Sequence, residues 1–307
     1  LKLLLSSRED IIVKYFSIVQ SVCGTGLSGF HEAIGTKDRS KIERLWAVAQ
    51  MRLRSNSGKK GDFMQDRYAG DIGDYGKIAL LKALQAQGLS IGVNWYKVDA
   101  LDIEKNADGS YKQEDGKYLI PEELRQCDEA LAEKLFDISC GKKPSIMALE
   151  RANLVPGAVY YNESVSVLQR AEWHQRALKL LKGADIIFMD PDNGMLVKSV
   201  GKKSARSVKY VFYEEVRDYI EQGQSVLIYN HRCRKPEETY FRDICEKLQE
   251  YIGVEENSIL KITFPKCSIR DYLAVPISED HLKKIRDAFT GMEQGVWGRL
   301  GLCRVPK

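Results

Sequence analysis

Short apolar runs and longer amphipathic segments alternate along the chain from residue 64 to the C-terminus. Apolar runs typical of strands occupy 90–98, 158–162, 185–189, 225–231, 259–265 and 271–277. Segments with apolar residues at helical spacing occupy 74–88, 121–136, 169–184, 213–224, 236–253 and a last stretch from Glu279. Repeated strand–helix–strand units of this length predict an α/β fold with a mainly parallel sheet and helices on both faces. The last two apolar runs are expected to form an antiparallel strand pair near the C-terminus.

Residues 1–63 differ from the rest of the chain and are expected to be an N-terminal extension or linker outside the core. One helix is predicted there, over 38–53, where apolar residues roughly keep helical spacing. The polar stretch 54–62, RSNSGKKGD, has the composition of a flexible linker. The chain is therefore divided into this segment and one α/β domain over 64–307.

Composition and charge restrict the class of protein only slightly. The formal net charge is +4 and the isoelectric point is near 8.5, which permits a nucleic acid partner without requiring one. The seven cysteines are scattered and never spaced as CxxC, so they predict neither a disulfide framework nor a zinc site. A reducing cytoplasm is the expected location. The apolar start LKLLL is too short to span a membrane, so no membrane association is expected.

The stretch DIIFMDPDNGM, at 185–195, contains the clearest candidate site. Its apolar run ends abruptly in Asp190, Pro191, Asp192 and Asn193, as happens when a buried strand delivers polar groups to the edge of a sheet. Ligands of open α/β sheets bind outside the carboxyl ends of the strands. Asp190 is therefore expected at the carboxyl end of a central strand, within a site.

A second motif, YAGDIGDYGKIALL at 68–81, resembles the amino-terminal motif of the bacterial 23S ribosomal RNA adenine-N6 methyltransferase family. That motif runs roughly Ala-Gly-Asn-x-Ala-Asp-x-x-Lys-His before a long helix, and Ala69, Gly70, Asp74 and Lys77 keep its spacing. The DPDN tip stands where this family carries Asp-Pro-Pro-Tyr after its fourth strand.

The resemblance implies the Rossmann-like fold of class I S-adenosylmethionine-dependent methyltransferases, acting on an amino group of a nucleic acid base. An exocyclic amine of adenine is a poor nucleophile because its lone pair is delocalised into the ring. Asp190 and the Pro191 carbonyl would accept hydrogen bonds from it. Asp74 and Lys77 would shape the pocket for S-adenosylmethionine, and nucleic acid would be the partner.

Five residues depart from the family's pattern. Asp71 stands in place of Asn, Gly73 in place of Ala, and Ile78 in place of a His that helps to form the cofactor pocket. Asp192 adds a negative charge where the family has a proline. Asn193 replaces the aromatic residue that stacks on the target base, a contact worth about 1–3 kcal/mol.

The sequence lacks two elements of the family's site: the aromatic residue that stacks on the base, and the glycine-rich turn that binds the cofactor. Tyr213, Phe212 or Tyr229 would have to supply the stacking that Asn193 cannot. Methyltransferases of this class also place a glycine-rich turn after the first strand, so that the backbone approaches the cofactor closely. Here the strand at 90–98 is followed by acidic residues, Asp99 and Asp102, with no glycine before Gly109.

Asn162 and Ser164, which follow the strand at 158–162, are candidates for polar contacts to the cofactor. The alternative interpretation is that they form a helix-capping turn before Val165.

A different interpretation assigns the tip to metal-dependent phosphodiester hydrolysis by a nuclease or phosphodiesterase. Asp190 and Asp192 would bind a hard cation, His231 would act as the base, and Arg232 or Arg234 would hold a phosphate. If their strands are parallel neighbours, these groups lie at the same sheet edge.

A third interpretation is a catalytically inactive nucleic-acid-binding module. The cationic segments 201–209 and 231–235 would then contact the nucleic acid backbone.

Overall fold

The computed structural model describes residues 65–98, 119–140, 144–232 and 236–306. The predicted N-terminal segment 1–63, with its helix and linker, lies outside the described residues. So do Asp99, Asp102 and Arg234. No helix in the described part of the chain is long and apolar enough to cross a membrane.

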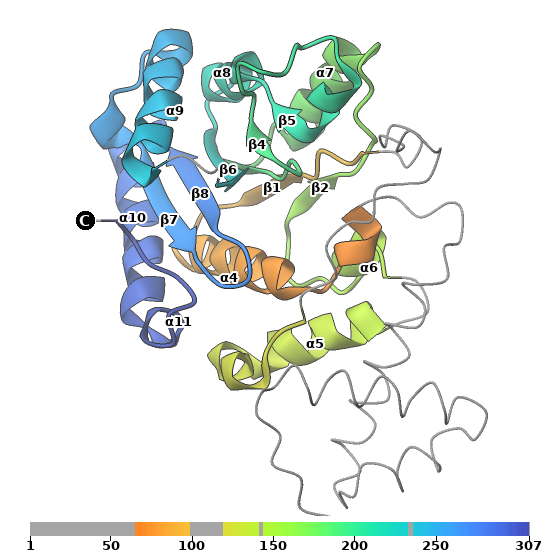
Figure 1. Cartoon of the computed structure of the whole chain (residues 1–307), viewed down its shortest axis with the longest axis vertical. Coiled ribbons are helices and arrows are strands. Elements are labelled where there is room, and N and C mark those ends of the chain that lie inside the picture. Colours follow the sequence, from red (N-terminus) through yellow and green to blue (C-terminus); the bar gives the residue numbers. More distant parts are fainter. Residues whose placement is uncertain (1–64, 99–118, 141–143, 233–235, 307) are drawn as a thin grey trace, which may run out of the picture. The chain divides into compact units, whose positions relative to one another are not determined.

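A six-stranded sheet forms the centre of the described structure (Figure 1). In spatial order its strands are β2 (Val159–Tyr161), β1 (Ile91–Asn94), β3 (Ile186–Met189), β6 (Ser225–His231), β8 (Arg270–Val275) and β7 (Leu260–Phe264). The first four are mutually parallel, whereas β8 runs antiparallel to both β6 and β7. The predicted mainly parallel sheet with an antiparallel pair near the C-terminus is confirmed.

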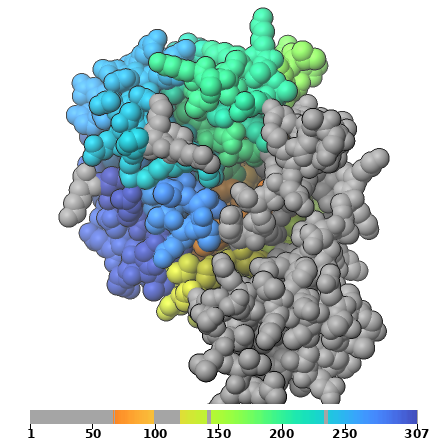
Figure 2. Space-filling view, viewed as in Figure 1, coloured from red at the N-terminus to blue at the C-terminus, as the bar shows by residue number. Residues whose placement is uncertain are grey.

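Helices cover both faces of this sheet, as the alternation of segments predicts (Figure 1). One face packs against α4 (Ile72–Ala86), α5 (Glu129–Cys140), α6 (Ile146–Arg151), α10 (Glu279–Gln294) and α11 (Val296–Arg299). The other packs against α7 (Arg170–Leu181), α8 (Tyr213–Glu221) and α9 (Glu237–Ile252). In the space-filling view, the blue C-terminal segment and the cyan atoms of α9 form a continuous surface (Figure 2).

The strand β3 shows why its sequence is apolar throughout. Successive side chains of a strand point to opposite faces of the sheet. Ile186 and Phe188 accordingly belong to the core beneath α4 and α10, while Ile187 and Met189 belong to the core beneath α7 and α8. All four residues are buried, so each of them is apolar. The first polar residue, Asp190, follows directly after the strand.

Asp128 divides the helix predicted over 121–136, so the prediction of one continuous helix was wrong. A 3-10 helix spans Glu122–Cys127, Asp128 follows it as the C-cap, and α5 begins at Glu129. Asp128 Oδ1 accepts a hydrogen bond from the N–H of Leu131 at 3.0 Å. An aspartate in this position caps a new helix and favours a break in the preceding one.

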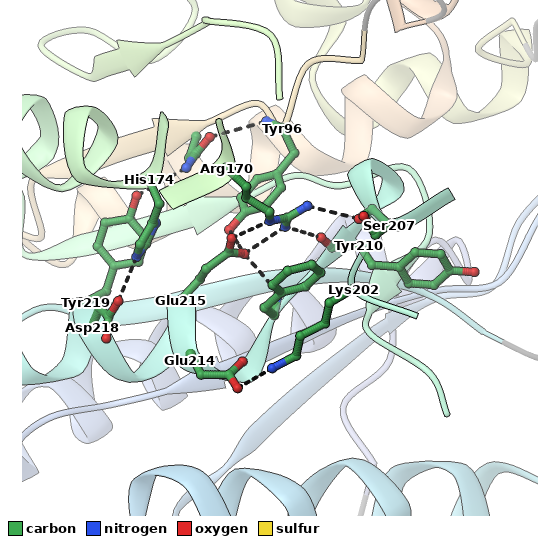
Figure 3. A network of polar contacts seen from close by, with 12 residues as sticks. Tyr96, Arg170, His174, Lys202, Ser207, Tyr210, Glu214, Glu215, Asp218 and Tyr219 are labelled. Atoms are coloured by element: carbon green, nitrogen blue, oxygen red, sulfur yellow. Dashed lines mark hydrogen bonds and ion pairs between the residues drawn. The ribbon is translucent and has the colours of Figure 1, made fainter. Parts of the chain in front are cut away.

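A buried ion pair fixes the segments that follow β1 and β3 (Figure 3). Arg170 on α7 donates to the Glu215 carboxylate on α8 through Nε at 2.6 Å and Nη2 at 2.9 Å. Arg170 also donates to the carbonyls of Ser207 at 3.0 Å and Tyr210 at 2.6 Å. These bonds hold the segment in which β4 (Gly194–Met195) pairs with β5 (Tyr210–Val211). Glu215 also accepts a hydrogen bond at 3.0 Å from the hydroxyl of Tyr96, next to the end of β1.

Gly194 is expected to be irreplaceable in the turn that closes the DPDN tip. Its φ is +107°, and a Cβ at this position would lie 2.0 Å from Oδ1 of Asn230. That oxygen accepts a hydrogen bond from the N–H of Met195 at 2.7 Å. We therefore expect Gly194→Ala to lower the free energy of unfolding by more than about 2 kcal/mol in urea denaturation.

Gly223→Ala is the matched control for this substitution. Gly223 has a φ of +87°, but a Cβ there would have no atom within 4 Å. It should cost only the conformational penalty of about 1 kcal/mol. Equal losses in the two variants would show that the contact with Asn230 does not determine the turn.

Candidate functional site

A pocket of about 250 Å³ lies at the carboxyl ends of β1 and β3, beside the start of α4. From β1 the chain crosses to β2 on one side and later returns to β3 on the other. The sheet therefore has a topological switch point between β1 and β3, which is where open α/β sheets bind ligands. The pocket wall combines four aspartates with Lys77, His231 and Arg270, and with three aromatic rings.

Asp190 lies at the carboxyl end of β3 and lines this pocket, as predicted. Its N–H donates to the carbonyl of Asn94 at the end of β1 at 2.9 Å, and only 6% of the residue is exposed. Lys77 Nζ lies 2.6 Å from Asp190 Oδ2 and 3.1 Å from Asp74 Oδ1. The structure thus brings Asp190, Asp74 and Lys77 together from two distant parts of the chain.

Burial controls the protonation of this cluster. It raises the pKa of Asp190 from 3.8 to about 6, because desolvation and the nearby Asp74 and Asp192 outweigh the attraction of Lys77. Burial alone would lower the pKa of Lys77, but Asp190 and Asp74 hold it well above its usual value. Near pH 7 the cluster is therefore an ion pair whose carboxylate can still accept hydrogen bonds.

Asp71 forms the N-cap of α4 and lines the same pocket. Its Oδ1 accepts hydrogen bonds from the N–H groups of Gly73 at 2.7 Å and Asp74 at 3.0 Å, so α4 begins at Ile72, earlier than predicted. Desolvation, followed by repulsion from Asp74, raises the pKa of Asp71 to about 6. The prediction of site residues missed Asp71, although an Asp before an amphipathic helix is a recognisable cap signal.

Gly70 makes this turn possible. Its φ is +86°, and a Cβ there would lie 2.4 Å from the carbonyl oxygen of Leu135. Its N–H donates to Asp74 Oδ2 at 2.7 Å, which orients the carboxylate that also contacts Lys77. The motif at 68–81 is therefore a local structure that aims carboxylates at the pocket.

Trp95 forms an aromatic wall of the pocket and was not predicted as a site residue. Its ring stacks on Tyr160 at 6.1 Å between centroids, and its Nε1 donates to Glu150 at 2.9 Å. Lys77 Nζ lies 5.5 Å from the centroid of the Trp95 ring. Of the three rings considered as stacking partners for a base, only Tyr229 lines the pocket.

The residues of the DPDN tip separate into two groups. Pro191 and Asp192 line the pocket with Asp190, and Lys209 Nζ lies 3.9 Å from Asp192 Oδ2. Asn193 does not line it. Its N–H donates to the Lys209 carbonyl at 3.0 Å and its carbonyl accepts from the His231 N–H at 3.2 Å, so its backbone has a structural part in the turn.

Asn162 and Ser164 follow β2 but do not line the pocket. Asn162 Nδ2 donates to both oxygens of the Glu150 carboxylate, at 3.2 and 3.0 Å. The alternative of a helix-capping turn before Val165 is wrong, because α7 begins at Arg170 with Gln169 at its N-cap.

His231 lines the pocket at the end of β6, and β3 and β6 are parallel neighbours, which is the condition for their ends to meet at one sheet edge. Burial and the neighbouring Arg270 lower the pKa of His231. Arg232, by contrast, donates to both oxygens of Asp271 at 2.8 and 2.6 Å and to Glu237 at 2.6 Å. Arg232 therefore belongs to a structural ion-pair network. It does not line the pocket, where the metal-dependent interpretation would need it to hold a phosphate.

Asp190, Asp192 and His231, the residues of the metal-dependent interpretation, line the same pocket. Within the ranges that the structure describes, no three His, Cys, Asp or Glu side chains are grouped so that they could hold a metal ion. In the cationic segment 201–209, Lys202 pairs with Glu214, and Lys209 lies near Asp192.

A scan of protein-family models and a search of curated proteins both found no match to this chain.

The polar residues that line the pocket are of the types that could hold a cofactor such as S-adenosylmethionine. The aspartates can accept hydrogen bonds from ammonium and hydroxyl groups, and the Trp95 ring suits a nearby cation. The turn after β1 differs from a glycine-rich turn, because Trp95 and Tyr96 fill it. Tyr96 nevertheless has a φ of +47°, the left-handed conformation that glycine adopts most readily.

Asp71→Asn should change how stability depends on pH. The folded protein binds a proton at Asp71 below about pH 6, whereas the unfolded chain has lost it above about pH 4, so stability falls as the pH rises through this window. Asparagine keeps the capping oxygen and removes the charge. We expect the variant to reduce that fall and to raise the free energy of unfolding at pH 7 by up to about 3 kcal/mol. Urea denaturation between pH 4 and pH 8 measures this, with the exposed Asp287→Asn as control. Superimposable pH profiles of the two variants would contradict it.

Proposed function

We propose that the protein is a methyltransferase-like enzyme with a Rossmann-like sheet that uses S-adenosylmethionine and acts on an amino group of a nucleic acid base. The observation that carries the proposal is the position of Asp190 and Pro191. They follow the central strand β3 at the switch point of the sheet and line the pocket there. The motif at 68–81 contributes Asp74 and Lys77 to the same pocket, as the family resemblance implies.

The chemistry of the pocket suits activation of an amine. Asp190 is mainly ionised near pH 7 because its pKa is about 6, so it accepts hydrogen bonds from an amino group. The carbonyl of Pro191, which also lines the pocket, would be the second acceptor. Together they increase the electron density on the nitrogen in the transition state.

Lys77 already donates to Asp190 Oδ2, and the target amine shares the carboxylate with it. A carboxylate offers about four lone-pair sites, so one ammonium does not exhaust it. Lys77 also keeps Asp190 ionised, since its attraction opposes the effect of burial. Its role in the proposed reaction is therefore to position and charge the acceptor.

Tyr229 would compensate for the missing aromatic residue at 193. It lines the pocket that contains Asp190. Stacking of a base on one such ring contributes about 1–3 kcal/mol, with little dependence on which base it is. An extruded base can thus be held in the pocket while its amino group contacts Asp190.

Isothermal titration with S-adenosylmethionine tests the proposal most directly. We expect saturable binding below millimolar ligand and transfer of a labelled methyl group to single-stranded RNA that contains adenine. At saturating S-adenosylmethionine, Asp190→Asn should lower the methyl-transfer rate by about 100-fold or more, because the acceptor loses its charge. Asp287→Asn, an exposed aspartate on α10, is the matched control. No binding at millimolar S-adenosylmethionine would refute the cofactor-dependent function.

A further inference from the structure

Arg270 is a buried cation whose hydrogen-bonding capacity is only partly used. It lies at the start of β8, lines the pocket and is 7% exposed. Its Nη1 donates to the carbonyls of Lys266 at 3.2 Å and Ser268 at 3.3 Å. In the part of the chain that the structure describes, no carboxylate lies within 4.0 Å of its guanidinium, and Nε and Nη2 have no acceptor.

These two nitrogens face Gly73 in the first turn of α4. A Cβ on Gly73 would lie 3.3 Å from Arg270 Nε and 3.4 Å from its Nη2. The same Cβ would lie 2.9 Å from Oδ1 of Asp71. Gly73 therefore lies within contact distance of both a guanidinium and a carboxylate, and the absence of a side chain lets both groups approach the first turn of α4 at the wall of the pocket.

Asp71 and Arg270 do not satisfy each other. The charges influence one another, since Arg270 lowers the pKa of Asp71 against the effect of burial, but no direct ion pair forms. Asp71 uses Oδ1 for the cap of α4, and among the described residues Oδ2 receives no hydrogen bond. A donor-rich cation and an acceptor thus border one pocket, each with capacity for a ligand.

We propose that Arg270 and Asp71 bind the carboxylate and the ammonium of an α-amino acid group, which enters the pocket beside Gly73. This assignment deepens the proposed function, on which its choice of S-adenosylmethionine rests. The pair takes over the part that a glycine-rich turn after β1 plays in the enzymes that the sequence resembles. Asp71, where that family has Asn, would then supply the charge that binds the ammonium. Gly73, where it has Ala, would let the ligand lie close to the start of α4.

Charge and geometry favour a zwitterion over a simple anion. The pocket contains more aspartates than basic residues, so a phosphate would be repelled, whereas a ligand with an added ammonium is not. The guanidinium of Arg270 presents two neighbouring donors, which match the two oxygens of a carboxylate. A carboxylate beside Gly73 also lies near the amino-terminal end of α4, where the helix dipole favours negative charge.

The experiment compares two pairs of ligands on the full chain by isothermal titration. One pair is S-adenosylmethionine and its decarboxylated form; the other is L-methionine and 3-(methylthio)propylamine, which lacks the carboxylate. In the wild type, the member with the carboxylate should bind about tenfold or more tightly, as expected for a charged, bidentate contact. Equal affinities within both pairs would overturn the inference without any variant.

Variants then assign the two charges. Arg270→Gln should abolish the preference for the carboxylate, and Arg270→Lys should restore only part of it, because lysine lacks the planar fork. Asp71→Asn should weaken both members of a pair and leave their ratio unchanged. The control is Arg242→Gln on α9, where the arginine side chain is 60% exposed, and it should match the wild type. A preference that survives in Arg270→Gln would refute the role of Arg270.

The outcomes separate this inference from the proposed function. If S-adenosylmethionine binds with no preference over its decarboxylated form, the function stands and the inference falls. If only L-methionine binds, and does so through Arg270, the inference stands and the cofactor-dependent function falls. If neither ligand with a carboxylate binds, the inference is refuted. Should Arg270→Gln fail to fold, Gly73→Ala provides the second variant, since its methyl group would crowd Asp71 Oδ1 and Arg270 Nε and so should weaken binding of the ligands with a carboxylate.

Discussion

The ion pair between Lys77 and Asp190 joins the two parts of the chain that make the pocket. The residues are 113 positions apart, yet their charged atoms lie 2.6 Å from each other with side chains only 12% and 9% exposed. Loss of one partner from such a buried pair leaves an uncompensated charge and typically costs about 3–5 kcal/mol. The pair therefore fixes the start of α4 against the end of β3, and with it the positions of Asp71, Gly73 and Asp74.

The pocket keeps charges that burial opposes, and the surrounding fold must stabilise them. Asp190 and Asp71 both have pKa values raised to about 6 mainly by desolvation. The sheet, buried on both faces, and the Arg170–Glu215 network hold the adjoining turns in place. A site of this kind reduces stability locally in exchange for preorganised charge, which is the common compromise in functional sites.

Features that depend on neighbouring residues in the sequence could be predicted, whereas features that depend on tertiary contacts could not. The strand β3 was found from sequence because burial on both faces makes its residues continuously apolar, and the position of Asp190 followed from its end. The strand β6 was found from its apolar run Val226–Ile228. Trp95 and Arg270 were missed, since a ring after a strand and a cation at the start of another look like core and surface until the tertiary structure joins them. Arg232 showed the reverse error: its sequence neighbours suggested a site, but Asp271 on β8 is its partner.

Binding of S-adenosylmethionine in the pocket bounded by Trp95 and the Lys77–Asp190 pair is a proposal that solution measurements can test. The most direct measurement follows the indole N–H signals of the tryptophans by two-dimensional NMR during titration with this cofactor. Of the four tryptophans, Trp95 should show a saturable shift, while the signals of Trp173 and Trp297, whose side chains do not line the pocket, stay in place. An unchanged Trp95 signal at millimolar cofactor, or equal shifts of the Trp95, Trp173 and Trp297 signals, would refute cofactor binding in this pocket.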